Sequence, residues 1–169
     1  MTEMGQGVAS YREVQRFRQV WLWAVVLSVA ILSLYFLAEQ VLSQPAPDTP
    51  FVVIAVIFGL GFPLLFYSLN LTVMVFPDGV HFRFFPLQWS YRRIPLDEVE
   101  SCEARTYSPL KEYGGWGIRY GRKGKAYNVS GNRGVQLVLS SGERILLGSR
   151  TPEDLALAIN SARKAGGKQ

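Results

Sequence analysis

The chain has 169 residues, a hydrophobic content of 49% and a formal net charge of +5. A single cysteine, Cys102, excludes an internal disulfide and any cysteine-based zinc site, and a single histidine, His81, excludes a multi-histidine metal site. Arg12, Arg16 and Arg18 precede the first long apolar stretch, and all other Lys and Arg residues follow the second one. From the single cysteine and the single histidine we expect no resident metal, and we expect no cofactor.

The first 19 residues form a basic segment that we expect on the cytoplasmic side of a membrane. Within this segment, Tyr11, Val14 and Phe17 have the spacing of one helix face. This pattern predicts a helix that lies on the membrane surface or extends the next segment inward. The alternative, which we prefer, is a basic flank that only fixes the orientation of the chain.

Two uncharged apolar runs follow, at residues 20–38 and 51–69, each of 19 residues. At ~1.5 Å of rise per residue, each run spans roughly the ~30 Å hydrocarbon core of a bilayer. The first run is longer than the core of a signal peptide, and no small-residue cleavage site follows it. We predict a transmembrane hairpin over residues 20–69, rather than a signal peptide or the buried hairpin of a soluble protein.

The orientation of the hairpin follows from its flanks. The loop 39–50 has no Lys or Arg, whereas both flanks are basic. The positive-inside rule then predicts a multi-pass protein of the plasma membrane, with an external loop and both termini in the cytoplasm. In the second run, Pro63 predicts a kink, and Gly59 and Gly61 predict close approach of the other helix.

From residue 70 onward the hydrophobic pattern changes from helical to alternating, which predicts a cytoplasmic domain over residues 70–169. We expect about seven short antiparallel strands, beginning with the hairpin 71–76 and 80–84 and ending with the hairpin 135–139 and 144–147. A terminal amphipathic helix begins after Thr151. The predicted fold class is α+β: a bent sheet or partly open barrel closed by one helix.

The second half of this domain resembles a bacterial pleckstrin-homology-like (PH-like) domain. The resemblance rests on a GWGIR strand, a KAY–SG–RGV hairpin and a G-S-R-x-P-E-x-L helix start, all within residues 115–159. With the apolar pair before it, the chain is similar to uncharacterised small prokaryotic membrane proteins of the same build. The resemblance implies a scaffold or binding module and gives no catalytic residues. It is not evidence for a particular activity, because a fold alone does not fix an activity.

The candidate binding surface is a basic turn with its neighbours. Lys and Arg near a cytoplasmic leaflet each contribute ~1 kcal/mol of attraction to anionic lipid, and aromatic residues with Arg are enriched at protein interfaces. An ordinary solvated turn is the alternative interpretation. We expect Trp116, Ile118 and Tyr120 in the core and Tyr113 as an exposed contact. The candidate binding residues are Arg119, Arg122, Lys123, Lys125, Arg133 and Tyr113.

The functional expectation is a non-enzymatic, membrane-anchored module. Cys102 reads as a small buried residue and His81 as a structural one, since nucleophilic catalysis needs a nucleophile beside a base. The partner is the bilayer together with a protein, a second copy of the chain or an anionic lipid, and no nucleic acid is expected. The alternatives are an accessory subunit of a membrane enzyme complex, a hydrolase using the acidic residues of 97–103, and a lipid-sensing module.

Overall fold

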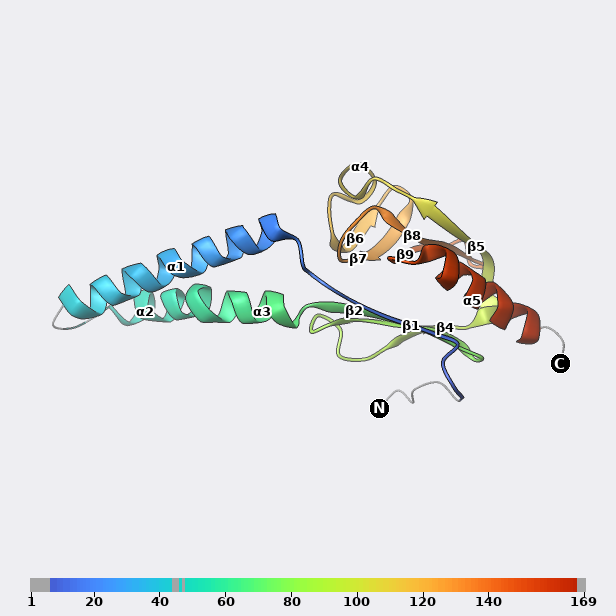
Figure 1. Cartoon of the computed structure of the whole chain (residues 1–169), viewed down its shortest axis with the longest axis horizontal. Coiled ribbons are helices and arrows are strands. Elements are labelled where there is room, and N and C mark those ends of the chain that lie inside the picture. The colour runs from blue at the N-terminus through green and yellow to red at the C-terminus, as the bar shows by residue number, and fades with distance from the viewer. Residues whose placement is uncertain (1–6, 44–45, 47, 167–169) are drawn as a thin grey trace. The chain divides into compact units, whose positions relative to one another are not determined.

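The computed structural model describes residues 7–43, 46 and 48–166, which divide into two compact units (Figure 1). The helical unit spans Phe17–Leu69, and the β unit contains the described residues before Phe17 together with those from Asn70 onward. The β unit is therefore discontinuous in sequence, because the helical unit is inserted after its first strand.

The helical unit contains two apolar helical segments in the described part of the chain, as the sequence predicts. Its first helix, α1 (Val20–Ser43), extends five residues beyond the uncharged run. The second segment consists of α2 (Thr49–Val56), the π-helical turn η1 (Ile57–Gly61) and α3 (Phe62–Ser68). By length and composition, both segments are able to cross a membrane.

A π-helical turn lies directly before the proline of the second segment. The Phe62 N–H donates to the Ile57 carbonyl, so the turn contains one more residue than an α-helical turn. Pro63, which has no N–H to donate, follows at once. The predicted close approach is found at Gly59, where a Cβ would lie 2.8 Å from Leu34 Cδ2, and not at Gly61, where nothing lies within 4 Å.

The first sheet of the β unit is antiparallel, with the strand order β1-β2-β3-β4 in the described part of the chain. The hairpin predicted at 71–76 and 80–84 is confirmed by β2 and β3. The helix predicted around residues 11–19 is wrong, because residues 11–16 form β1 and pair with β2. The strand bounds are β1 Tyr11–Arg16, β2 Asn70–Phe76, β3 Gly79–Phe85 and β4 Arg92–Ile94.

The second sheet is mixed, with the order β5-β8-β9-β7-β6 among the described strands. The predicted hairpin of β8 and β9 is confirmed. The expectation of an all-antiparallel fold with a KAY–RGV hairpin is wrong, because β7 pairs in parallel with β9, which separates it from β8. The bounds are β5 Val99–Thr106, β6 Gly117–Gly121, β7 Gly124–Asn128, β8 Arg133–Leu139 and β9 Arg144–Gly148.

Three helical segments complete the described part of the β unit. A 3-10 turn, η2 (Leu96–Glu98), links the sheets, and a short helix, α4 (Pro109–Tyr113), follows β5. The terminal helix α5 (Pro152–Gly166) forms as predicted and buries Leu155 and Ile159. It contacts strands of both sheets, namely β1 and β2 of the first and β5 and β8 of the second (Figure 1).

The main core lies between the two sheets. Leu71, Val73 and Val75 of β2 are fully buried, and the alternation of a strand places all three on one face. The rings of Phe82 on β3 and Tyr127 on β7 meet edge to face, 4.7 Å between centroids, so this aromatic pair joins one sheet to the other.

The first strand presents polar rather than apolar side chains to the interior. The Gln15 side chain is buried, and its Nε2 donates to the Gly148 carbonyl at 2.6 Å. The Glu13 carboxylate accepts from Ser149 Oγ at 2.7 Å and from the Arg150 N–H at 2.9 Å. These bonds connect β1 to the last residue of β9 and to the segment between β9 and α5.

Candidate functional site

The candidate site lies on the face of the second sheet that carries α4. This short helix has local start and stop signals: Ser108 is its N-cap residue, Pro109 occupies its first turn, and Gly114 ends it in the left-handed conformation at φ 72°. The N–H of Gly115 closes the end by donating to the Pro109 carbonyl at 3.0 Å.

Beneath α4 is a small second core of Tyr107, Tyr113, Ala126 and Leu146. The two tyrosine rings pack edge to face, with 5.9 Å between centroids. The Asn128 amide Nδ2 donates to the Tyr107 hydroxyl at 3.0 Å. Tyr113 is only 3% exposed, so its predicted role as an exposed contact is wrong: its ring holds α4 on the sheet.

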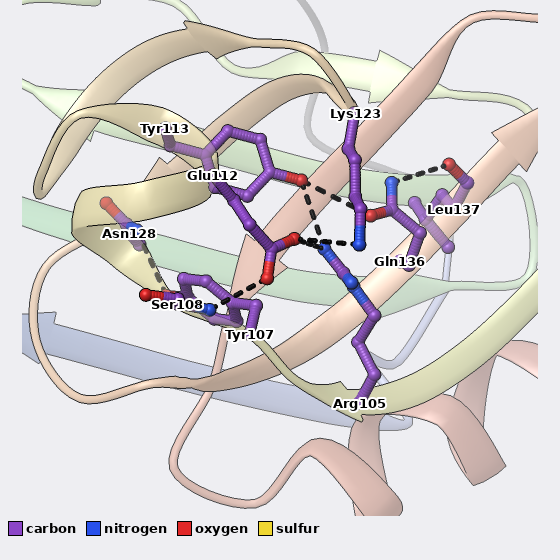
Figure 2. Close-up of polar contacts among 9 residues, drawn as sticks. All are labelled: Arg105, Tyr107, Ser108, Glu112, Tyr113, Lys123, Asn128, Gln136 and Leu137. Carbon is purple, nitrogen blue, oxygen red and sulfur yellow. Dashed lines mark hydrogen bonds and ion pairs between the residues drawn. The ribbon is translucent and has the colours of Figure 1, made fainter.

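The Glu112 carboxylate is the centre of the polar network at the edge of this core. Figure 2 shows it between the Ser108 amide and two cations, Arg105 and Lys123. Its Oε1 accepts from the Ser108 N–H at 2.8 Å, and its Oε2 lies 2.7 Å from Arg105 Nη2 and 3.3 Å from Lys123 Nζ. Arg105 Nη2 also lies 3.3 Å from the Tyr113 hydroxyl, which faces Gln136.

The protonation states of this network follow from its contacts. Partial burial opposes ionisation of Glu112, but the Ser108 N–H and the Arg105 guanidinium outweigh it and lower the pKa of the carboxyl. Burial raises the pKa of Tyr107 to about 12 and also raises the pKa of Tyr113. At neutral pH the network therefore contains an ionised carboxylate, two cations and two neutral phenols.

Next to the network is a shallow depression of about 240 Å³, which we call the basic depression. Arg105 Nε is buried there and has no hydrogen-bond partner among the described residues. Glu103, opposite Gln136 in the strand register, shares this face. Cationic and amide donors with few carboxylates suit the binding of an anionic group. The residues lining the basic depression are Arg105, Lys123, Gln136, Val138 and Arg144.

The predicted basic residues do not gather on one surface. Lys123 lines the basic depression, and Arg122 is exposed in the same turn. Arg119 Nε donates to the Trp116 carbonyl at 2.9 Å, and Arg133 forms an ion pair with Glu153 of α5.

Lys125 and Tyr120 lie together, away from the basic depression. Lys125 Nζ lies over the rings of Tyr120 and Tyr127, at 4.7 and 5.1 Å from their centroids. Alternation along β7 places Lys125 on the face opposite Ala126 and the second core. Tyr120 is 76% exposed, and Trp116 and Ile118 are half-buried, so the expectation that these three residues form core is wrong.

Four residues of the site were not among the sequence candidates: Arg105, Glu112, Gln136 and Arg144. The first three come from segments that the alternation pattern describes only as strand or loop. The signal for Glu112 is the Ser-Pro start and Gly-Gly end of α4, which define a helix even though five residues are too few to show a period.

The single cysteine and histidine lie outside this site. Burial raises the pKa of the Cys102 thiol to about 11. His81 is 2% exposed, and its Nε2 lies 3.2 Å from an oxygen of Asp78 in the turn between β2 and β3. Among the described residues, no group of three or more His, Cys, Asp or Glu side chains could hold a metal ion.

The sequence was compared with models of protein families. The family model described as a family of unknown function (DUF6141) matches residues 2–165, and the chain belongs to this family. No curated protein matches the chain.

Proposed function

We propose that this protein is a non-enzymatic, membrane-anchored binding module whose PH-like domain lies on the cytoplasmic side of the plasma membrane. Its basic depression binds an acidic segment of a partner protein. The observation that carries the proposal is the convergence of Arg105, Lys123 and Arg144, from three separate elements, on one depression beside the Gln136 amide.

Two observations support the membrane anchor. Only 11% of the most apolar window of each helical segment is buried within the structure, whereas the core helix of a soluble protein is mostly buried. In addition, β1 precedes the helical unit and pairs with β2, which follows it. Two spans return the chain to the side where it started, as this pairing requires, and the basic flanks favour the cytoplasm.

The PH-like assignment is supported by the two packed sheets and by α5, which contacts both of them. The parallel pairing of β7 with β9 is a departure from the antiparallel arrangement that the resemblance implies. The proposal that the domain is a binding module depends on the basic depression and not on the fold.

The charges of the depression favour a protein carboxylate over a phosphate group. Glu112 already occupies one edge of the Arg105 guanidinium, and Glu103 lies on the same face. These two carboxylates offset most of the charge of the three cations, so the small net positive charge that remains matches a singly charged side chain. The donors of Lys123 and Arg144, which are exposed at the depression, suit an Asp or Glu side chain.

Charge reversal at Arg144 tests the proposal. Arg144→Glu places a carboxylate at the rim of the depression, and Lys164→Glu makes the same charge change at an exposed position of α5. The full-length variants are purified from native membranes in mild detergent, and the proteins and lipids that accompany them are identified by mass spectrometry.

We expect a stoichiometric protein partner with the wild type and Lys164→Glu that is lost with Arg144→Glu. Equal recovery with all three proteins would refute the assignment to the basic depression. Enrichment of an anionic lipid, without any protein, would favour the lipid-sensing alternative instead.

A further inference from the structure

We infer that the loop between β3 and β4, residues 86–91, is a second membrane contact, which inserts Leu87 and Trp89 into the interfacial layer of the bilayer that holds the apolar helices. This inference rests on the proposed membrane anchor and adds a contact made by the β unit itself. It concerns a lipid surface, whereas the basic depression is proposed to bind protein.

The strand register places this loop at the end of the first sheet where the chain enters the helical unit. Phe85, the last residue of β3, pairs with Asn70, the first residue of β2, and Asn70 pairs with Arg16 on its other side. Asn70 directly follows Leu69, the last residue of the helical unit. Since neighbouring strands lie ~4.8 Å apart, the loop begins one strand spacing from Asn70, where the chain leaves the helical unit.

The loop exposes two large apolar side chains. Leu87 is 63% exposed and Trp89 is 77% exposed, and only one residue separates them. Tryptophan favours the membrane–water interface, because its ring is apolar and its N–H is polar. A Trp and a Leu together at the membrane-proximal end of a tethered domain therefore suit the interfacial layer.

The conformation of the loop is fixed by its own contacts. The Arg83 guanidinium lies 4.5 Å from the centroid of the Tyr91 ring, and its Nη1 donates to the Trp89 carbonyl at 3.4 Å. The Gln88 N–H donates to the Phe84 carbonyl at 2.8 Å. The exposed side chains are thus held in place before any contact with lipid, so insertion requires little additional ordering.

Basic residues beside the loop match the headgroup layer. Arg16 is exposed and lies two strands away at the same sheet end, and Arg83 lies in β3 close to the loop. Cations next to interfacial aromatics are attracted to anionic headgroups. This combination favours the lipid surface over an apolar groove on a protein.

Site-specific fluorescence tests the inference in the full-length protein. In a Cys102→Ala background, single cysteines replace Leu87, Leu157 or Ile31 and carry a small environment-sensitive dye. Leu157 is the matched control: it is 68% exposed and lines a groove with Pro77, at the other end of β2. Ile31, in α1, is the reference for insertion of the helices.

The labelled proteins are reconstituted into vesicles of phosphatidylcholine and phosphatidylglycerol, with iodide present on both sides as an aqueous quencher. We expect quenching at position 87 to be about fivefold or more weaker than at position 157, because an interfacial side chain is shielded from water. Quenching at position 31 should be weaker still.

Equal quenching at positions 87 and 157, with position 31 shielded, would overturn this inference and leave the membrane anchor standing. Strong quenching at position 31 as well would overturn both. The vesicles contain no other protein, and a repeat at a lower protein-to-lipid ratio separates lipid from a second copy of the chain. Shielding at position 87 that persists on dilution is due to lipid, and shielding that is lost would overturn the inference.

Discussion

A single carboxylate, that of Glu112, connects α4 to β5 and to the turn after β6. Replacing it with the uncharged Glu112→Gln keeps the shape of the side chain but removes the charge that Arg105 and Lys123 face. Because hydrogen bonds to charged groups contribute about 1.5–3 kcal/mol, we expect the free energy of unfolding at neutral pH to fall by about 1–3 kcal/mol. Thermal unfolding of the full-length protein in detergent micelles measures this loss.

The same substitution has a defined pH dependence. The pKa of Glu112 in the folded protein is lowered from 4.5, so its stabilising effect is complete above pH 4.5 and disappears as the pH falls through the lowered value. The difference in melting temperature between wild type and Glu112→Gln should therefore shrink below pH 4.5. The exposed Glu143→Gln serves as control, and a pH-independent difference would contradict the role of the charge.

Cys102 should react slowly with alkylating reagents. Burial raises its pKa from 9.0 to about 11, and only the thiolate is nucleophilic. At pH 8 we expect iodoacetamide to modify it ~100-fold more slowly than a thiol of ordinary pKa. A cysteine at the exposed neighbouring position, Ser101→Cys in a Cys102→Ala background, provides the reference, and equal rates would contradict the prediction.

At the scale of elements, β1 shows how an alternating pattern is misread. Its inward residues, Tyr11, Glu13 and Gln15, are polar, while Val14 faces outward and is exposed. The usual rule that apolar residues mark the buried face therefore fails, and the apolar spacing of Tyr11, Val14 and Phe17 suggests a helix instead. The strand is specified by partners far away in the sequence, which local patterns do not reveal.

Substitution of Gln15 tests the contribution of β1 to the β unit. Gln15→Leu fills a similar volume but removes the 2.6 Å bond to the buried Gly148 carbonyl. We expect a loss of about 1–3 kcal/mol in the free energy of unfolding, the cost of a buried polar group left without its bond. Val14→Thr, on the exposed face of the same strand, should change stability by less than about 0.5 kcal/mol. Similar denaturation midpoints for both variants would contradict the assignment.

The close contact of α4 with β6 depends on a glycine. A Cβ at Gly121 would lie 2.1 Å from the Glu112 carbonyl oxygen and 2.9 Å from the Tyr113 ring. Gly121→Ala should therefore shift α4 and destabilise the protein by about 1–3 kcal/mol, as other overpacking substitutions do. Gly166→Ala at the end of α5, where nothing lies within 4 Å, should leave the melting temperature unchanged. An unshifted melting temperature for Gly121→Ala would show that α4 is free to move.

Elements with strong local signals are those that the sequence predicts well. The hairpin of β2 and β3, the hairpin of β8 and β9, and α5 all follow from alternation, turns and caps within a few residues. The parallel pairing of β7 with β9 is set by the strand order of the whole sheet. The candidate site escaped prediction for the same reason, since Arg105 and Arg144 meet only because β5, β8 and β9 are adjacent.

At the scale of the whole molecule, the β unit can be separated from the helices. Arg16 and Asn70 are paired opposite each other, so a two-residue Asn-Gly turn can replace residues 17–69 and join β1 to β2 as a hairpin. We expect the shortened chain to be soluble and folded, with dispersed amide signals in a two-dimensional NMR spectrum. The fragment 70–169, which lacks β1, should give poorly dispersed signals. Equally good spectra from both would show that β1 is dispensable.

The position of β1 in the sequence also determines when the β unit can close during synthesis. It leaves the ribosome before the helices, but its strand partner β2 and the bonding groups at Gly148, Ser149 and Arg150 are all translated after them. In a chain whose helices span the membrane as proposed, β1 stays unpaired until both apolar helical segments have inserted and β2 has been translated. A hairpin that inserts with its two ends on opposite sides would keep β1 from β2 and leave an open sheet edge, which is a site of aggregation and recognition by chaperones. Closure of the β unit thus depends on correct insertion, and a misinserted chain is marked by its own unpaired strand.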